Sequence, residues 1–388
     1  MPEAAQPLAP PSRVLLGPGP SDISPRVLAA LARPAIGHLD PAYLAIMDGL
    51  AAMLRQIFAT ENELTFVVPG TGSAGMEACI ANLVEPGDEV IVGVAGYFGD
   101  RLREVATRYG AQVHVVAAEW GDTIREEQIA AALAAHPRTR LVGLVHAETS
   151  TGAHQPLEEI SRLVHEAGAL LLVDAVTSLG GLPLAVDDWG IDACYSCSQK
   201  CLGSAPGLSP VTFSPAAVAA IRGRRTPVRS FYLDALLLGR YWGSERVYHH
   251  TAAVQLNFAL YEALSLVLEE GLEARIERHR RHHRALRAGL EAMGLAYVAH
   301  RPLTTLNAVG VPPGVDDARV RRRLLTEFGI EIGAGLGPFR GKVWRIGLMG
   351  EGSRLRNVLL CLAALETLLG GEGLVLPRGA ALAAASAG

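Results

Sequence analysis

The amino-acid sequence predicts an α/β fold, in which a mostly parallel β-sheet is flanked by helices and a smaller α+β domain follows near the C-terminal end. Strand-like apolar runs alternate with helical patterns at a spacing that is typical of parallel sheets covered on both faces. The chain has 388 residues, of which 49% are hydrophobic and 19% charged. This composition is that of a folded protein with a sizeable core, and the length allows two packed domains.

The first half of the chain supplies most elements of this sheet. A helical pattern over residues 40–58 precedes an apolar strand at 64–68, a glycine-rich turn at 69–75 and a helix that begins at Met76. The following strands are expected at residues 89–94, 112–117, 141–147, 170–174 and 192–196, with helices at 97–109, 126–136 and 156–167.

The second half of the chain has a different pattern. From Ala252 onward the sequence is helical, and it leads into a second set of strands and helices at residues 295–370. The last residues, GAALAAASAG, are of low complexity. We therefore expect four parts, namely an N-terminal arm (1–21), a large domain (22–270), a small C-terminal domain (271–375) and a flexible tail (376–388).

Composition also limits the partners of the protein. The formal net charge is −4 and no basic block occurs, so a nucleic-acid-binding surface is not expected. No apolar run approaches the roughly 18 residues of a membrane-spanning helix, and the start MPEAAQPLAPPSR lacks the pattern of a secretory signal. The odd number of five cysteines argues against a disulfide framework. We expect a cytoplasmic protein that acts on small molecules.

Lysine is rare in this sequence and therefore informative. It occurs only at Lys200 and Lys342, and arginine supplies all the other permanently charged basic side chains. Arginine cannot lose its proton near neutral pH, but a lysine amine can, and it can then form a Schiff base with a carbonyl. Lys342 lies in the segment GPFRGKVW, which is typical of a solvated turn. Lys200 ends the weakly charged run DACYSCSQK and is the candidate for chemistry.

A glycine-rich turn follows the strand at 64–68. Its sequence, from Gly70 to Gly75, fits G-x-G-x-x-G, a pattern known from dinucleotide-binding sites. The acidic residue that binds the ribose of NAD should close the next strand, but Asp88 and Glu89 open that strand instead. The turn can still bind an anion, because glycine amides and a helix N-terminus favour negative charge. We expect a phosphate group here, and a purely structural tight turn is the alternative.

Asp174 ends the apolar strand LLLVD. A lone carboxylate at the end of a buried strand is costly unless a cation or a strong donor meets it. The protonated ring nitrogen of pyridoxal phosphate (PLP) would be such a partner, and PLP also has an aldehyde for Lys200 and a phosphate for the glycine-rich turn. An aspartate that only caps the following loop is the structural alternative. The combination of the three features favours a PLP site.

Two further clusters resemble metal sites. Cys194, Cys197 and Cys201 give Cys-x-x-Cys-x-x-x-Cys, but no second pair of ligands follows, which disfavours zinc. His279 and His283 lie one helical turn apart, yet the arginines beside them would repel a cation. We therefore expect a solvated helix face there and no metal.

Several motifs, in order along the chain, resemble the class V, fold-type I PLP-dependent aminotransferases, in particular the alanine–glyoxylate and serine–pyruvate group. The resemblance implies the fold of a fold-type I PLP-dependent transferase, with a mostly parallel seven-stranded sheet, and a homodimer. The motifs span nearly the whole chain and are LLGPGPSDI (15–23), HAETSTG (146–152), VDAVTSLGG (173–181), SQK (198–200), YHHT (248–251) and WRIGLMGE (344–351).

The resemblance also implies roles toward PLP. Lys200 would carry the Schiff base and then act as the base that moves a proton from the substrate α-carbon to the cofactor, while Asp174 would hold the ring nitrogen. Phe98 and Val176 would pack on the two faces of the ring, and Thr149 would hydrogen-bond the ring hydroxyl oxygen. The phosphate would be bound by Gly72, Ser73 and Gln199 and, from the neighbouring subunit, by Tyr248 and Thr251.

For the substrate, the resemblance implies Gly19, His38 and Arg345. An arginine can bind the carboxylate of an amino acid or a 2-oxo acid with two parallel hydrogen bonds. The implied reaction moves an amino group from a small L-amino acid, alanine or serine, to glyoxylate by a ping-pong mechanism, and yields glycine and a 2-oxo acid. The alternative is an (S)-ureidoglycine–glyoxylate aminotransferase of purine breakdown, to which AEWG (118–121) is also similar. Such enzymes carry amide side chains at the positions of His38 and Tyr248, which favours alanine or serine here.

Overall fold

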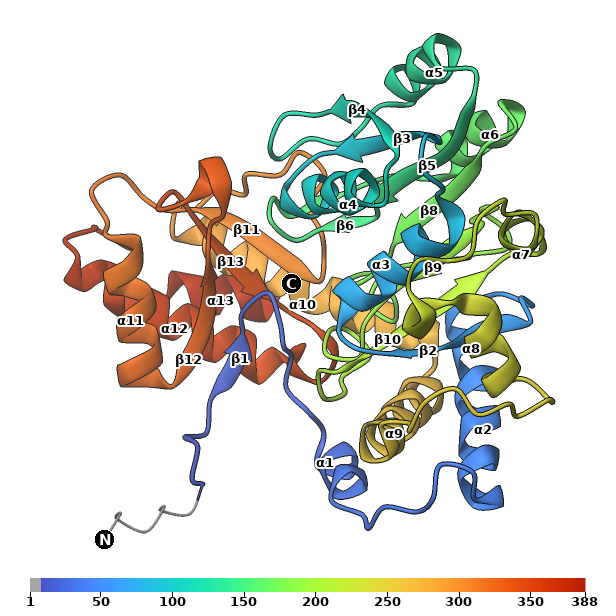
Figure 1. Ribbon diagram of the computed structural model, residues 1–388. Coiled ribbons are helices and arrows are strands. Elements are labelled where there is room, and N and C mark those ends of the chain that lie inside the picture. Colours follow the sequence, from blue (N-terminus) through green and yellow to red (C-terminus); the bar gives the residue numbers. More distant parts are fainter. Residues whose placement is uncertain (1–7, 388) are drawn as a thin grey trace, which may run out of the picture.

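The computed structural model describes residues 8–387, and its main feature is a seven-stranded sheet (Figure 1). The strand order is β2-β10-β9-β8-β5-β3-β4, and only β10 runs antiparallel to its neighbours. The prediction of a mostly parallel seven-stranded sheet is confirmed. The strands are β2 (Leu64–Pro69), β3 (Glu89–Val94), β4 (Gln112–Ala117), β5 (Thr139–Val145), β8 (Leu170–Asp174), β9 (Ala193–Tyr195) and β10 (Leu208–Phe213).

Helices cover both faces of this sheet. Because crossovers between parallel strands are right-handed, the strand order places α3 (Gly72–Leu83) and α4 (Tyr97–Arg108) on one face, and α5 (Glu126–Ala135) and α6 (Glu158–Glu166) on the other. The edge at β2 is covered by α2 (Pro41–Phe58) and α8 (Ala235–Trp242). No helix within residues 8–387 is long and apolar enough to cross a membrane. The remaining helices of this part are α1 (Pro25–Leu31), α7 (Pro215–Arg222) and α9 (Val254–Glu270).

The carboxyl ends of the central parallel strands lie side by side. In their register Val145 pairs with Asp174, and Asp174 pairs with Tyr195. These strands are almost entirely apolar because both of their faces are covered, and polar side chains begin where they end. In sheets of this kind the carboxyl ends of the strands are the usual place for a binding site.

A second, smaller unit follows, with its own hydrophobic core. Its four-stranded sheet has the order β1-β12-β13-β11, and β1 (Val14–Leu16) pairs in parallel with β12. Part of the predicted N-terminal arm is therefore a strand of the small sheet. The other elements are β11 (Leu306–Gly310), β12 (Ile330–Ala334), β13 (Val343–Gly347), α10 (Leu272–Ala292), α11 (Asp317–Phe328), α12 (Leu355–Gly371) and α13 (Ala380–Ala387), and a short hairpin of β6 (Ala147–Glu148) and β7 (Ala153–His154) precedes α6.

Helix α13 forms where the sequence predicts a flexible tail. It packs against α10 with Ala381 and Ala385 buried. Gly289 of α10 permits the close approach, because a Cβ atom there would lie 2.9 Å from the carbonyl oxygen of Ala381. Alanine has the highest intrinsic helix propensity, so an alanine-rich segment becomes helical once a neighbouring surface is present to cover it.

The structure contradicts the solvated helix face that the sequence predicts at residues 279–283. All three histidines of this part of α10 are buried. The Nδ1 atom of His279 donates to the carbonyl oxygen of Arg275 at 2.7 Å, and its Nε2 accepts from the backbone nitrogen of Gly350 at 3.0 Å. Both ring nitrogens of His279 thus have protein partners, which explains how this polar side chain can be buried.

Candidate active site

A cavity of about 210 Å³ lies at the carboxyl ends of β5 and β8, beside the N-terminus of α3. The segments around it are far apart in the sequence, and only the fold brings them together. Of the residues predicted for the site, those that line it are Gly72, Ser73, Phe98, Thr149, Asp174, Val176, Gln199 and Lys200.

Lys200 lies in the turn that follows β9, and it is held there by its neighbours. Its Nζ donates a hydrogen bond to the carbonyl oxygen of Pro18. The turn itself is fixed by Ser21, whose Oγ donates to the Lys200 carbonyl oxygen at 2.8 Å, and by Arg275, whose Nη2 donates to the Cys201 carbonyl oxygen at 2.8 Å. Burial lowers the pKa of Lys200, because loss of water disfavours the charged amine. The amine is thus biased toward its neutral, nucleophilic form.

Gly19, which the sequence assigned to the substrate, lies directly against Lys200. A Cβ atom at Gly19 would lie 2.2 Å from the Nζ of Lys200. The φ angle of Gly19 is also +104°, in the left-handed region that favours glycine. Any larger residue here would displace the lysine amine.

Asp174 lies at the end of β8, lines the cavity and is only 3% exposed. Its two oxygens accept hydrogen bonds from the Tyr195 hydroxyl at 2.6 Å and from the Val176 backbone nitrogen at 2.9 Å. Burial raises the pKa of Asp174 to about 6, because these neutral donors do not replace the lost water completely. A cationic N–H donor in the cavity would be stabilised by this carboxylate and would in turn keep it ionised.

The N-terminus of α3 forms another wall of the cavity. Its N-cap residue Thr71 makes no side-chain capping hydrogen bond, so the first backbone N–H groups are left for another acceptor. The helix dipole favours an anion at this position. Gly72 has no room for a side chain, because a Cβ atom would lie 2.8 Å from the Cγ2 of Val176. The helix begins at Gly72 and not at Met76 as the sequence suggests, so part of the glycine-rich turn is the first helical turn.

Arg345 lies beside the cavity although it belongs to β13 of the other sheet. Its Nε donates to the Ala334 carbonyl oxygen at 2.6 Å, and its Nη1 donates at 3.3 Å to the carbonyl oxygen of Thr149, a residue of the cavity wall. Burial lowers the pKa of Arg345 to about 10, which still leaves the guanidinium charged at neutral pH. Within residues 8–387 its Nη2 has no hydrogen-bond partner, so this part of the fork remains for a carboxylate.

The sequence profile of class-V aminotransferases matches residues 25–338, which is most of the chain. The chain belongs to the class-V aminotransferase family. This membership confirms the resemblance that the motifs show, and similar solved structures confirm the fold.

Known proteins match nearly the full length of this class-V aminotransferase. The (S)-ureidoglycine–glyoxylate transaminase of Bacillus subtilis is 40% identical over 97% of this chain and 95% of its own length. The alanine–glyoxylate aminotransferase of Mus musculus is 42% identical over 92% of this chain and 88% of its own. The crystal structure of alanine–glyoxylate aminotransferase from Nostoc sp. has a TM-score of 0.93 at 52% identity. The match covers 95% of this chain and 98% of the Nostoc chain. The crystal structure of ureidoglycine–glyoxylate aminotransferase from Bacillus subtilis has a TM-score of 0.96 at 41% identity. The match covers 98% of this chain and 99% of the Bacillus chain.

Glu148 is a residue of the site that the sequence analysis missed. It is buried in β6, and its Oε2 accepts from the backbone nitrogens of Phe98 and Gly99, each at 3.1 Å. Its Oε1 accepts from the Ser150 hydroxyl at 2.5 Å, and this hydroxyl accepts from the Tyr97 backbone nitrogen at 2.9 Å. Helix α4 has no side-chain cap of its own, so Glu148 of β6 and Ser150 of the following turn cap it and hold Phe98 at the cavity. The signal for this role was the acidic residue inside the motif HAETSTG.

Arg101 is a second residue that the sequence analysis missed. It lines the cavity one helical turn after Phe98, and its guanidinium carbon lies 5.2 Å from the centre of the Phe98 ring. Its Nη1 lies 3.4 Å from the Oγ of Ser73. A cation at this place adds positive potential beside the N-terminus of α3. The spacing of three residues from Phe98 on a helix was the only sequence signal.

Five predicted residues do not line the cavity within the single chain. Gly19 and Arg345 lie beside it, as described above, and the other three are His38, Tyr248 and Thr251. Tyr248 is 57% exposed, Thr251 is also exposed, and His38 is half-buried. The rings of His38 and Tyr248 are 5.3 Å apart at their centres. The assignment of Tyr248 and Thr251 to the site of a neighbouring subunit therefore stays a prediction, as does that of His38 to the substrate.

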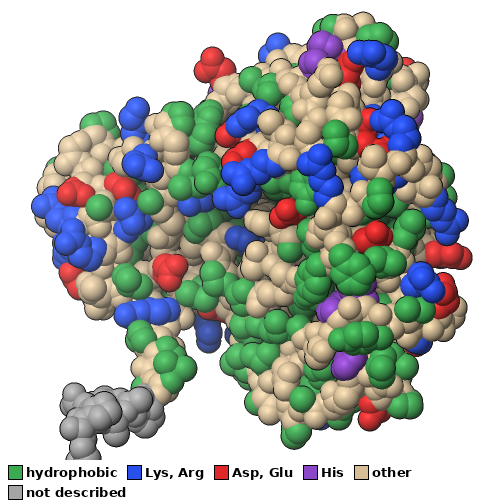
Figure 2. All heavy atoms as spheres, in the orientation of Figure 1, with side chains coloured by type: hydrophobic (Ala, Val, Ile, Leu, Met, Phe, Trp, Pro, Cys, Tyr) green, Lys and Arg blue, Asp and Glu red, His purple; other side chains and the backbone are tan. Residues whose placement is uncertain are grey.

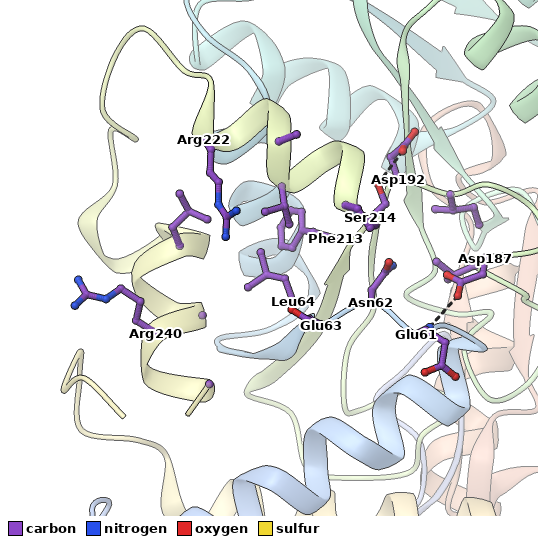
Figure 3. A pocket seen from close by; sticks show the side chains of 18 of the residues that line it. Glu61, Asn62, Glu63, Leu64, Asp187, Asp192, Phe213, Ser214, Arg222 and Arg240 are labelled. Atoms are coloured by element: carbon purple, nitrogen blue, oxygen red, sulfur yellow. Dashed lines mark hydrogen bonds between the residues drawn. The ribbon is translucent and has the colours of Figure 1, made fainter. Parts of the chain in front are cut away.

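A larger hollow of about 1590 Å³ lies at the amino ends of the parallel strands β2 and β9, away from the smaller cavity (Figure 3). Two of its acidic groups already have partners, because Asp187 accepts from the Glu61 backbone nitrogen at 2.8 Å and Asp192 from the Ser214 hydroxyl at 2.8 Å. The residues that line it, all within the described part of the chain, include no lysine. The smaller cavity is therefore the candidate active site.

Proposed function

We propose that this protein is a PLP-dependent aminotransferase that moves the amino group of a small L-amino acid, alanine or serine, to glyoxylate, and so forms glycine and a 2-oxo acid. The observation that carries the proposal is that Lys200 and Asp174 line one cavity together with the uncapped N-terminus of α3. Relatives named alanine–glyoxylate aminotransferase, such as that of Drosophila melanogaster at 40% identity, support the choice of substrates.

The residues of the cavity fit PLP. When bound, PLP supplies an aldehyde for covalent attachment and an electron-withdrawing ring. The buried carboxylate of Asp174 lacks a cationic partner of the kind that a protonated ring nitrogen provides, and the first N–H groups of α3 lack an acceptor of the kind that a phosphate provides. We assign the remaining contacts to Phe98 and Val176 for the two ring faces, Thr149 for the ring hydroxyl, and Gly72, Ser73, Gln199 and Arg101 for the phosphate.

In this proposal Lys200 and Arg345 act on the substrate. The Lys200 amine would accept the proton from the substrate α-carbon, because burial favours its neutral form. Arg345 would bind the substrate carboxylate through its free Nη2 and so fix the orientation of the α-carbon relative to Lys200. The first product would leave before glyoxylate binds, in ping-pong order.

Borohydride reduction of the holoenzyme tests the proposal. A pyridoxyl adduct should appear on the peptide that contains Lys200, and Lys342 serves as the internal control because it is the only other lysine. The Lys200→Arg variant should keep its circular dichroism spectrum but lose the adduct and at least about a thousandfold of the turnover. A protein without any adduct, or with the adduct on Lys342, would refute the proposed function.

(S)-Ureidoglycine is a second candidate donor. The TM-score of 0.96 with the ureidoglycine–glyoxylate aminotransferase of Bacillus subtilis favours it. A screen of alanine, serine and (S)-ureidoglycine against glyoxylate, with glycine formation as the readout, separates the two functions. The higher kcat/KM identifies the donor, and a preference for ureidoglycine would replace the first proposal.

We further infer a homodimer in which Tyr248 and Thr251 reach the phosphate site of the partner subunit. Hydrophobic side chains gather on the face over α1, α8 and α9 (Figure 2). Exposed apolar patches of this kind are typical of protein–protein interfaces. The large exposed side chains on or near these helices include Leu28, Phe231, Tyr232, Val247, Tyr248 and Tyr261.

A further inference from the structure

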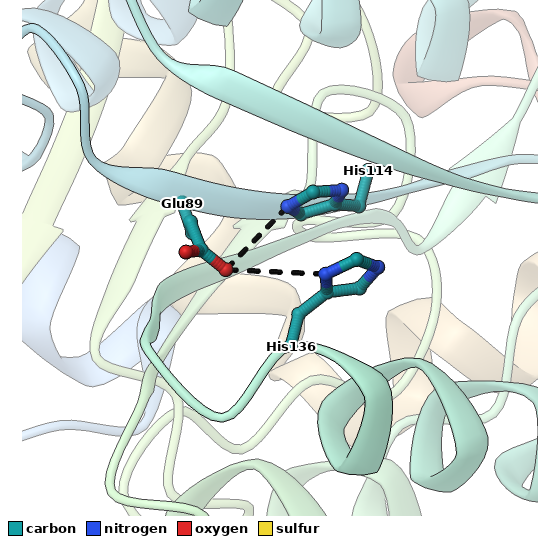
Figure 4. Close-up of side chains that lie close together, drawn as sticks. All are labelled: Glu89, His114 and His136. Atoms are coloured by element: carbon teal, nitrogen blue, oxygen red, sulfur yellow. Dashed lines mark ion pairs between the residues drawn. The ribbon is translucent and has the colours of Figure 1, made fainter.

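One glutamate and two histidines form a cluster on the large sheet (Figure 4). It lies near the amino end of β3, whereas Lys200 lies beyond the carboxyl ends of the parallel strands. Glu89 is the first residue of β3, His114 lies in β4, and His136 follows α5. In the parallel register Ile91 pairs with His114, so Glu89 and His114 project from the same face of the sheet. One oxygen of Glu89 and one nitrogen of each ring lie within 4.8 Å of one another.

The polar contacts inside this cluster are incomplete. The Oε2 of Glu89 lies 3.5 Å from the Nε2 of His114 and 3.9 Å from the Nδ1 of His136, and both distances exceed those of ordinary hydrogen bonds. The Nε2 of His114 is buried and has no hydrogen-bond partner in the described part of the chain. A buried nitrogen without a partner is costly, and a bound ion would remove this cost.

Arg138 leaves the oxygen that faces the histidines free. Its Nε and Nη2 donate to the Oε1 of Glu89 at 2.9 and 2.5 Å. This pairing lowers the pKa of Glu89, so the carboxylate stays ionised. The Arg138 side chain is 82% exposed, and solvent therefore screens its charge toward a cation at the cluster.

The backbone holds the three side chains in place, while the rings keep some freedom. The His136 backbone nitrogen donates to the Ala132 carbonyl oxygen at 2.9 Å, and its carbonyl oxygen accepts from the Thr139 nitrogen at 3.0 Å. The rings of His114 and His136 stack with centres 3.4 Å apart. Because an imidazole lone pair lies in the ring plane, the rings must turn apart to face one ion. Their side chains are 27% and 34% exposed, which leaves room for this turn.

We propose that Glu89, His114 and His136 bind Zn²⁺ or a similar divalent transition metal ion. Two imidazoles and one carboxylate are a ligand set that zinc favours, and tetrahedral geometry requires ligand atoms about 3.3 Å apart. The 3.5 Å between Glu89 and His114 is close to this value, and His136 has to approach by about half an ångström. A water molecule would take the fourth position of a tetrahedral site.

The role of this ion is structural. It connects the edge strand β4 to β3 and to the turn after α5. Strand β3 has 6 residues, which separates the ion from the active-site edge of the sheet by about 17 Å. Metal binding should therefore stabilise the fold without taking part in amino-group transfer.

Titration of the chelator-treated, full-length holoenzyme with Zn²⁺ tests the proposal. Calorimetry should show one equivalent bound with a dissociation constant in the micromolar range or below, together with a higher Tm. His114→Ala and His136→Ala should each weaken binding at least about tenfold. The matched control is His300→Ala, because the one ion pair of His300 among the described residues is with Asp122, at 3.8 Å, and this variant should bind Zn²⁺ like the wild type.

Cobalt gives an independent readout of the same site. The visible bands of tetrahedral Co²⁺ should appear in the wild type and disappear in His136→Ala, while aminotransferase activity is retained in both proteins. If His136→Ala does not fold, His136→Gln replaces it, since it keeps a polar side chain of similar size. Equal Zn²⁺ affinity in the wild type and either His136 variant, or no stoichiometric binding in the wild type, would overturn the proposal.

Discussion

The burial of Asp174 makes the stability of the protein depend on pH. Its pKa is raised from 3.8 to about 6, so between these values the folded state keeps a proton that the unfolded chain has released. The contribution of Asp174 to the free energy of unfolding must therefore fall as the pH rises from about 4 to about 6, and this loss persists above this range. In cofactor-free protein, the stability of Asp174→Asn relative to the wild type should rise over the same range and then stay constant. Urea unfolding at a series of pH values measures this difference, and parallel curves would contradict the burial argument.

The proposed role of Arg345 depends on the geometry of its guanidinium fork, which a lysine cannot reproduce. Its Nε and Nη1 are bound to backbone oxygens, so the direction of Nη2 is fixed. Arg345→Lys should lower kcat/KM for both the amino acid and the 2-oxo acid by about tenfold to hundredfold, mainly through KM. Steady-state kinetics with both substrates measure the effect. Arg340→Lys, at an exposed position nearby, should leave them unchanged, and an equal effect of both variants would remove Arg345 from the substrate site.

At the scale of elements, the position of Phe98 depends on how α4 is capped. Glu148 accepts from the first backbone N–H groups of this helix, and burial raises the pKa of this carboxyl group. Glu148→Ala should cost about 1–2 kcal/mol of stability, because the cap is lost, and should weaken the binding of PLP. Denaturant unfolding and a spectroscopic PLP titration measure the two effects. The control is Glu104→Ala on the exposed side of α4, where only a surface pair with Arg108 is lost and the change should stay below about 0.5 kcal/mol.

The elements could be predicted where local pattern and packing agree. The strand Leu170–Asp174 has the bounds that its apolar run predicts. Strand β10 was missed because it contains Pro210, and proline is rare within a sheet. The carbonyl oxygen of Pro210 still accepts a hydrogen bond from the Ser196 nitrogen at 2.9 Å. Proline therefore removes only the hydrogen bond that a backbone N–H would donate. The long helical pattern after Ala252 is two helices, because Gly271 between them has a φ angle of +82°.

The candidate site could be predicted where the chemistry restricts the residue type. Lys200 stood out because lysine is rare in this chain, and Asp174 because a carboxylate ends an apolar strand. Glu148 and Arg101 are ordinary charged residues in the sequence, and their roles depend on how β6, α3 and α4 pack together. The buried His279 was misread for the same reason, since the partners of its ring are defined by the fold of α10 and the segment that contacts it.

At the scale of the whole molecule, the proposed dimer would decide whether each active site is complete. The single chain already brings together Lys200, Asp174 and the N-terminus of α3. In the proposed function these groups would provide the covalent attachment and most contacts to PLP. The exposed Tyr248 and Thr251 do not line this cavity within their own chain. In the proposed dimer each subunit therefore supplies the lysine of its own site and a phosphate contact of the other.

Hybrid dimers of Lys200→Ala and Tyr248→Ala subunits test this exchange. If Tyr248 acts on the partner subunit, one site of each hybrid contains neither wild-type side chain and the other contains both. Random pairing makes about half of the dimers hybrids, so about a quarter of the wild-type activity should appear at limiting PLP, well above either parent. If Tyr248 acts within its own chain, no site of the hybrid is intact, and the mixture can only show the average of its parents. Co-expression with two purification tags, followed by glycine formation assays, distinguishes the two arrangements.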